Sequence, residues 1–221
     1  DYTKVASFDL EQTFQILKTS PQGLSENEAK KRLGTSGKNI FSQKKITIWE
    51  IFVRQFNNAF LYLLVGASFV SLALGQAQQA LTILAITFLT ALFGFFLEYR
   101  SQKAEEKLSL LLKKTCWVKR QDSKEEIDES LLVPGDVVLL AAGDIVPADC
   151  RLTAAENLQV DEAVLTGESA PVIKATDRVE ALTSINKAKN LVFTGTAVQS
   201  GSAEAVIFAT GSATQIGRIS Q

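Results

Sequence analysis

The sequence contains no histidine and no methionine, and its only cysteines are Cys116 and Cys150. Without histidine, neither a Ser-His catalytic pair nor a His-based zinc site can form within this chain. Any acid–base chemistry must therefore use carboxylates, Lys, Tyr or Cys. Two cysteines are too few for a disulfide scaffold, and free cytosolic thiols are the favoured interpretation over a redox or metal pair. The lack of Met even at position 1 is typical of a processed or excised chain.

Charge is nearly balanced overall but unevenly distributed. The 23 Lys and Arg residues and 24 Asp and Glu residues give a net charge of -1, so no basic face is available and no nucleic-acid partner is expected. Residues 59–97 contain no charged residue at all. The composition therefore combines an apolar segment with polar flanking regions.

Two apolar runs lie within residues 48–98, at about 59–75 and about 80–97, separated by a Gln-rich connector. As helices each would be roughly 26–27 Å long, close to the thickness of a hydrocarbon core. A secretory signal is disfavoured because the first run begins far from the N-terminus. We predict a two-helix transmembrane hairpin. A buried helical hairpin of a soluble protein is the alternative.

The regions around the hairpin are predicted to be helical. Within residues 1–47, one amphipathic helix is expected around residues 9–18. A second helix is expected to start with a capping box at Ser25 and Glu28 and to end before Gly34. After the hairpin, residues 99–114 are charged with a leucine stripe and are predicted to form a solvated stalk helix.

Residues 115–221 are predicted to be β-rich, because short Val- and Leu-rich runs alternate with Gly, Pro and Asp turns. The predicted strands are Thr115–Lys119, Val137–Leu140, Cys150–Thr153, Leu158–Val164, Leu191–Val198 and Ala203–Ala209. This pattern favours a distorted sandwich or jelly-roll. The expected fold class is thus an α+β membrane fragment: a helical segment, a transmembrane hairpin and a β-rich domain.

The most informative motif is Thr166-Gly167-Glu168-Ser169, which follows a β-like run. Gly167 allows close backbone approach to a partner. Glu168 supplies a carboxylate that could orient a water molecule, and Thr166 and Ser169 add hydroxyl groups. These residue types favour hydrolysis of an acyl-phosphate.

Further motifs follow the predicted hairpin in a definite order. They are Pro134-Gly135-Asp136, Gly143-Asp144-x-x-Pro147-Ala148-Asp149, the TGES motif, Val192-Phe193-Thr194-Gly195-Thr196 and Thr210-Gly211-x-x-Thr214-x-Ile216-Gly217-Arg218-Ile219. With the amphipathic N-terminal segment and the hairpin, this order resembles that of a P-type cation-transporting ATPase over essentially all 221 residues. The family's phosphorylated aspartate lies in a DKTGT motif, which this chain does not contain. The resemblance is therefore to the N-terminal part of the pump: the first two membrane helices and the actuator domain.

The resemblance implies roles for three residues. Glu168 positions the water that attacks an aspartyl-phosphate, while Thr166 and Gly167 shape the loop that enters the phosphate site. ATP and Mg²⁺ are bound by domains absent from this chain, so the fragment alone is expected to be inactive. The implied partners are the phosphorylation and nucleotide-binding domains, the lipid bilayer and the transported cation. A divalent cation, calcium or magnesium, is favoured, and sodium and protons stay open.

Two rival functions are a membrane-anchored β-domain that acts as a scaffold and a two-span channel subunit. For Asp144 and Asp149, turn formation through local hydrogen bonds is favoured over metal binding. Asp161 and Glu162 could support the catalytic loop without a chemical role. The chain has no phosphate-binding P-loop.

The charge distribution predicts topology. Basic residues precede the first run and follow the second, so both flanks should be cytoplasmic in an integral membrane protein of the cell membrane. A cysteine placed at Gln78 should be labelled from outside, and one at Lys124 only after permeabilisation. Labelling at position 124 in intact cells would contradict this topology.

Overall fold

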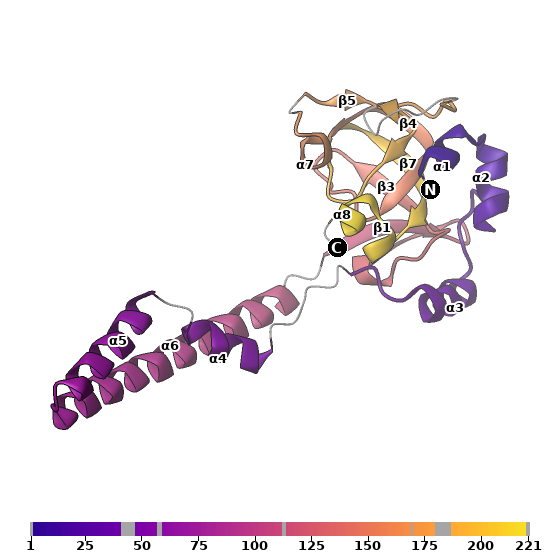
Figure 1. Ribbon diagram of the computed structural model, residues 1–221. Helices are drawn as coiled ribbons and strands as arrows, with labels where there is room; N and C mark the ends of the chain where they lie inside the picture. The colour runs from indigo at the N-terminus through magenta and orange to yellow at the C-terminus, as the bar shows by residue number, and fades with distance from the viewer. Residues whose placement is uncertain are drawn as a thin grey trace. The chain divides into compact units, whose positions relative to one another are not determined.

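The computed structural model describes residues 2–40, 47–56, 59–111, 114–168, 170–179 and 187–219. The chain divides into two compact units, residues 1–42 with 114–221 and residues 43–113. Figure 1 shows the first unit as a curved sheet with helices beside it, and the second as a group of three helices.

The second unit is helical throughout its described residues. Its helices are α4 (Ile48–Phe56), α5 (Ala59–Ala73) and α6 (Ala77–Leu111). A turn at residues 74–76 joins α5 to α6, and the two helices pack along one another. Helix α4 also packs on α6, where the rings of Phe52 and Phe95 meet edge to face with centroids 6.0 Å apart. The predicted stalk is thus continuous with α6, which runs for 35 residues, or about 52 Å.

Among the described residues, only α6 contains a segment long and apolar enough to cross a membrane. This segment is Ala77–Ala104; an 18-residue stretch within it has a mean hydropathy of 2.3, and only 17% of that stretch is buried within the chain. Such low burial argues against the core helix of a soluble protein. Helix α5 is apolar but has 15 residues, about 22 Å, which is shorter than a bilayer core. The structure therefore shows a helical hairpin with one helix of membrane-spanning length.

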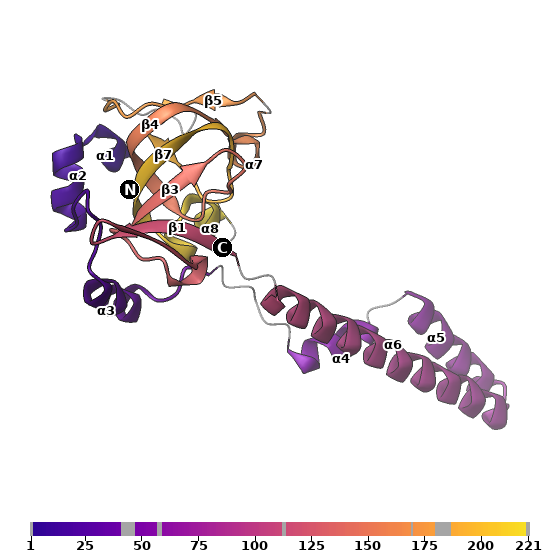
Figure 2. The same cartoon turned by 180° about the vertical axis from the view of Figure 1, so that it is seen from behind.

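The first unit contains a seven-stranded sheet with the order β2-β1-β3-β7-β4-β5, and β6 pairs with β4. Its strands are β1 (Thr115–Arg120), β2 (Ser123–Asp128), β3 (Val137–Ala141), β4 (Asp149–Asp161), β5 (Val172–Ile173), β6 (Leu191–Val192) and β7 (Ala197–Ala209). All neighbouring strands are antiparallel. Figure 2 shows β1, β3, β7, β4 and β5 following one another across the sheet. The β-rich prediction is confirmed as a single hydrogen-bonded sheet.

Two long strands differ from the short strands that we predicted. β4 merges two predicted strands, and β7 runs without interruption through residues 199–202, which separate two of the predicted strands. Register shifts interrupt their pairing at four places, one of them beside Asn157, whose φ is 50°. Such bulges bend a strand and increase its twist, which lets one sheet curve around its own core. The charged strand β2 was missed, because Ile127 is its only apolar residue and gives no alternating apolar pattern.

The sheet encloses one main apolar core. Its fully or almost fully buried residues come from β1, β3, β4, β6 and β7 and from the turns between them: Val118, Leu132, Val138, Leu140, Val146, Ala148, Cys150, Leu152, Leu158, Val160, Val192, Val198, Ala203, Ala205 and Ile207. Cys150 belongs to this core, and both cysteines are free. Burial raises the pKa of Cys116 to about 12, so its thiol stays protonated at neutral pH.

Three short helices precede the sheet in sequence and belong to the same unit: α1 (Tyr2–Ser7), α2 (Leu10–Leu17) and α3 (Glu26–Ser36). Long-range polar contacts attach them. The Arg32 guanidinium donates to the carbonyls of Leu17, Lys18 and Pro134 at 2.7–2.8 Å. The Asn39 amide donates to the carbonyls of Glu129 and Pro147. These contacts make the N-terminal segment part of the sheet unit.

Helix α3 begins as predicted but ends later. The Ser25 hydroxyl accepts from the Glu28 amide, whereas the Glu28 carboxylate pairs with Arg32 instead of completing the capping box. The helix passes through Gly34 and ends at Gly37, which adopts a φ of 75°. The complete capping box lies at α2, between Asp9 and Gln12.

Asp149 links three segments rather than shaping a local turn, which corrects the sequence-based interpretation. Its carboxylate accepts hydrogen bonds from the amides of Thr194 and Gln215, 45 and 66 residues away, at 2.9 and 2.7 Å. The side chain is almost fully buried. Burial raises its pKa from 3.8 to about 6, although these two amides and Arg218 act in the opposite direction.

This pKa predicts a pH dependence of stability. Because the carboxyl binds its proton more tightly in the folded chain, its contribution to stability is complete below about pH 4 and is lost as the pH rises through about 6. Between pH 4 and 7, wild type should lose up to about 3 kcal/mol of unfolding free energy relative to Asp149→Asn. Urea unfolding in detergent, followed through Trp117 with Trp49→Phe in both chains, measures this difference. Parallel pH profiles would contradict the assignment.

Candidate functional site

The TGES motif lies in the segment that connects two paired strands of the sheet. β4 ends at Asp161, a short helix α7 (Ala163–Thr166) follows, and the chain returns as β5. β5 pairs with the end of β4, with Val160 opposite Val172. The segment between them is therefore a loop whose two ends are held side by side. The predicted strand Leu158–Val164 was too long, because the chain turns into α7 after Glu162.

A buried ion pair closes the base of this loop. The Lys174 ammonium lies 2.5 Å from Glu162 Oε1, and the two side chains are 0% and 1% exposed. Lys174 also donates to the Ala188 carbonyl at 3.2 Å. Burial raises the pKa of Glu162 and lowers that of Lys174, and in each case the partner's charge opposes the shift. Within the described residues, Glu162 Oε2 has no hydrogen-bond partner.

Short hydrogen bonds connect this base to the tip of the loop. The Glu162 carbonyl accepts from the amides of Leu165 and Thr166 and from the Thr166 hydroxyl, at 2.9–3.1 Å. The same hydroxyl accepts from the Glu168 amide at 3.2 Å. Before the helix, Asp161 accepts from the Ala163 amide. Thr166 is thus the link between Glu162 and Glu168.

An apolar contact of Leu165 also holds helix α7 in place. Leu165 packs against a small cluster that contains Ala6, Ala188, Leu191 and Phe193. Ala6 comes from α1, so the N-terminal segment helps to support the loop. The neighbouring Val164 is 68% exposed and points away from this cluster.

The tip of the loop is exposed. Gly167 ends α7 in the left-handed region, with a φ of 76° and an amide that donates to the Ala163 carbonyl. Glu168 follows it and is exposed. Within the described part of the chain, its carboxylate makes no hydrogen bond or ion pair. Ser169 of the motif lies outside the described residues.

This arrangement leaves one carboxylate exposed at the tip of the loop. A carboxylate can orient water and accept its proton, and among the described tip residues Gly167 and Glu168 it is the only ionisable side chain. The described residues also contain no group of three or more His, Cys, Asp or Glu side chains that could hold a metal ion. The structure thus brings Thr166, Gly167 and Glu168 together, and adds Lys174, which the sequence analysis did not single out.

The other predicted motif residues lie in turns and contacts of the same unit. Asp136 is fully buried and forms a bidentate pair with Arg120, at 2.9 and 2.8 Å. Asp144 accepts from the Ala141 amide at 2.8 Å, a local turn contact as predicted. These side chains support the fold, and Glu162 supports the loop without reaching its surface.

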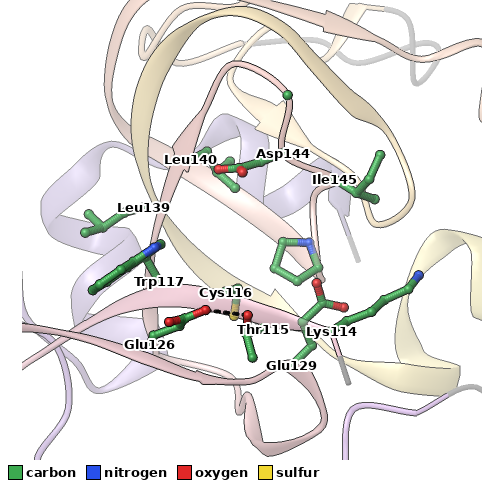
Figure 3. A pocket seen from close by; sticks show the side chains of 12 residues that line it. Lys114, Thr115, Cys116, Trp117, Glu126, Glu129, Leu139, Leu140, Asp144 and Ile145 are labelled. Carbon is green, nitrogen blue, oxygen red and sulfur yellow. Dashed lines mark hydrogen bonds between the residues drawn. The ribbon is translucent and has the colours of Figure 1, made fainter. Parts of the chain in front are cut away.

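A separate hollow of about 410 Å³ lies against β1 and β3 (Figure 3). Its walls are formed by Lys114, Thr115, Cys116, Trp117, Glu126, Glu129, Leu139, Leu140, Gly143, Asp144, Ile145 and Pro147. None of these residues belongs to the TGES loop. Inside the hollow, the Thr115 hydroxyl contacts Glu126 at 2.5 Å. The hollow is therefore distinct from the candidate site.

Comparison with known proteins gives matches over both parts of the chain. A family model described as the P-type ATPase actuator domain matches residues 110–221. A second, described as the N-terminus of cation transporters and ATPases, matches residues 6–71. The two matches cover the sheet, helices α2, α3 and α4 and most of α5.

Individual relatives agree with these families. A sodium/potassium exporting P-type ATPase of Schizosaccharomyces pombe is 38% identical over 209 residues, 93% of this chain and 20% of that protein. A calcium-transporting ATPase of Bacillus subtilis is 36% identical over 90% of this chain and 22% of its own length. The calcium-transporting ATPase type 2C member 2 of Rattus norvegicus is 35% identical over 98% and 23%, respectively. The chain therefore spans only about a fifth to a quarter of these relatives.

The loop geometry predicts different effects for two glycine substitutions. A Cβ at Gly167 would meet no atom within 4 Å, so Gly167→Ala should cost only the left-handed backbone strain, about 1 kcal/mol. At Gly201, with a similar φ of 81°, a Cβ would lie 2.3 Å from the Glu156 carbonyl oxygen. Gly201→Ala should therefore destabilise the sheet unit clearly more in the same urea unfolding assay. Equal losses of stability would contradict this account of the loop.

Proposed function

Because the chain belongs to the P-type cation-transporting ATPases, we propose that it is the actuator domain and first membrane hairpin of an ATP-driven cation pump. The proposal depends most on one observation: an unpaired, exposed carboxylate, Glu168, on a loop whose base is anchored in the sheet. Such a group can act on a substrate that another domain carries.

The proposed reaction is hydrolysis of an aspartyl-phosphate. A covalent phosphoenzyme divides ATP hydrolysis into two steps, and the actuator serves the second. Glu168 orients a water molecule toward the phosphorus and accepts its proton as the bond to the aspartate breaks. The aspartate is then released as a free carboxylate together with inorganic phosphate. Because Glu168 is exposed, its carboxylate can reach a phosphate on a separate domain.

Thr166 and Gly167 shape the loop for this task. The Thr166 hydroxyl fixes the Glu168 amide, and Gly167 turns the chain without placing a side chain beside the carboxylate. A loop tip without a Cβ at position 167 can approach a phosphate group more closely than one with a side chain. These two residues position Glu168 and do not take part in proton transfer.

ATP and Mg²⁺ belong to the later domains of the proposed pump. One exposed carboxylate beside hydroxyl groups does not match the octahedral oxygen set that Mg²⁺ prefers. The partners of this chain are therefore the phosphorylation and nucleotide-binding domains of the same pump. Since the two halves of the reaction lie on separate domains, hydrolysis waits until the actuator moves, and this delay couples chemistry to transport.

The pump is proposed to lie in the cell membrane with both ends of this chain in the cytoplasm. The apolar, largely uncovered segment Ala77–Ala104 supports insertion into a bilayer. The basic residues on both flanks of the apolar segment support this orientation.

The proposed cargo is a divalent cation. Two of the relatives are named for calcium transport, which supports calcium before magnesium. Sodium is the second candidate, because another relative is named as a sodium/potassium exporter. ATPase activity of the full-length pump across a panel of Ca²⁺, Mg²⁺, Na⁺ and H⁺ conditions separates these possibilities.

The proposed role of Glu168 is tested in the full-length pump with Glu168→Gln. The amide keeps the size but cannot accept a proton, so dephosphorylation should slow by about 10²–10⁴-fold. Phosphoenzyme formation should change little, because that step does not use this loop. Pulse-labelling with radioactive ATP and a cold chase measures both rates. Decay at the wild-type rate would show that Glu168 is only a turn residue.

A further inference from the structure

The ion pair between Glu162 and Lys174 is unusual for its burial. Both side chains are essentially inaccessible, and the Lys174 ammonium is shared between Glu162 and the Ala188 carbonyl. It lies directly below a loop whose tip is exposed. A charged pair at such a position needs an explanation beyond packing, because burying two charges carries a large desolvation cost.

Stability is a poor explanation for this pair. Replacing a buried ion pair with apolar side chains of similar volume is often neutral or stabilising. One oxygen of this pair, Glu162 Oε2, has no partner within the described residues, which reduces the benefit further. The better-attested use of a buried polar contact is to select one arrangement of the chain over its alternatives.

The contacts around Glu162 show which arrangement is selected. The Glu162 side chain is paired with Lys174, which directly follows β5. The Glu162 carbonyl accepts three hydrogen bonds from Leu165 and Thr166. Thr166 in turn fixes the Glu168 amide. A rotation or shift of Glu162 is therefore transmitted through Thr166 to the exposed carboxylate.

We propose that Glu162 and Lys174 are positioning residues that fix the place of the Glu168 carboxylate for phosphoenzyme hydrolysis. The inference rests on the function proposed above. The apolar contact of Leu165 with its cluster holds one side of α7 but leaves rotation about that contact open. The ion pair holds the chain at Glu162 as well, so that α7 cannot rotate about the Leu165 contact.

The expected slowing of dephosphorylation follows from a displacement of the Glu168 carboxylate. A misplacement of about 1 Å in a reacting group can reduce a rate by 10²-fold. Removing the ion pair should thus slow dephosphorylation by about 10–100-fold, less than the loss of the Glu168 carboxylate itself. Phosphoenzyme formation from ATP should stay within about twofold of wild type, since it does not use the loop.

The test uses the full-length pump with the double variant Glu162→Leu/Lys174→Met, which removes both charges and leaves neither unpaired. Formation and decay of the phosphoenzyme are measured by pulse and chase, and thermal unfolding confirms that the variant is folded. If this variant does not fold, Glu162→Asp takes its place. Its carboxylate is one methylene shorter, so it should keep the charge but stretch the contact and slow decay at least threefold.

A matched control is the ion pair between Arg120 and Asp136 in the same sheet unit, in which Asp136 is fully buried and Arg120 is 12% exposed. Arg120→Met/Asp136→Asn removes that pair, and its Asn oxygen can still accept from the Val133 amide that Asp136 binds. The control should lower stability without slowing phosphoenzyme decay. Equal slowing in the control would mean that any weakening of the sheet unit produces the effect, and would overturn the inference.

A double-mutant cycle with Glu168→Gln tests whether the pair acts through Glu168. If it does, Glu162→Leu/Lys174→Met should add less than about twofold slowing in the Glu168→Gln background. Full additivity, or decay at the wild-type rate in the pair variant alone, overturns the inference. Decay at the wild-type rate in Glu168→Gln alone instead overturns the proposed function. The two failures are therefore separate observations.

Discussion

The pairing of β4 with β7 is the constraint on which the rest of the sheet unit depends. These two 13-residue strands carry β3 on one side and β5 and β6 on the other. Most residues of the main core belong to β4 and β7 or to the turns next to these strands. The bulges in their register curve the sheet, and the end of β4 sets the position from which the TGES loop leaves it. The Glu168 carboxylate is thus exposed on a support that is itself well packed.

Buried polar side chains connect segments that lie far apart in the sequence. Arg151 is fully buried, and it donates to carbonyls of Phe8, Leu152, Thr176 and Asn190. Burial lowers its pKa to about 10. Asn39 and Asp149 make similar long-range contacts. Because each buried donor or acceptor is expensive to leave unpaired, these contacts specify one arrangement of the segments. They explain why the N-terminal helices belong to the sheet unit although the helical hairpin separates them in sequence.

This architecture suits a domain that must move as one body. The loop tip projects a carboxylate outward, whereas the loop base is joined to the core by an ion pair, an apolar contact and paired strands. In the proposed function, rotation of the whole unit carries Glu168 toward or away from its target without remodelling the loop. In the proposed pump, such movement decides when the aspartyl-phosphate is hydrolysed, and the chemistry itself needs only one group from this chain.

The sequence alone determined the general organisation, because its signals are local. The charge-free segment, the turn residues and the ordered motifs predicted the helical hairpin, a β-rich domain and Glu168 as the candidate reactive residue. Local patterns could not predict that two expected strands merge into β4, that a third divides between β6 and β7, that β2 forms from charged residues, or that α3 extends to Ser36. Pairing with neighbouring strands and long-range hydrogen bonds decide these features.

The partners of individual polar residues were likewise decided only by the tertiary structure. Asp149 meets amides 45 and 66 residues away, and Lys174 meets Glu162 across the loop. Neither contact has a sequence signature, since a buried charge finds its partner through the fold rather than through spacing. The sequence thus determined which residue could act as the base, and the tertiary structure decided what holds it in place.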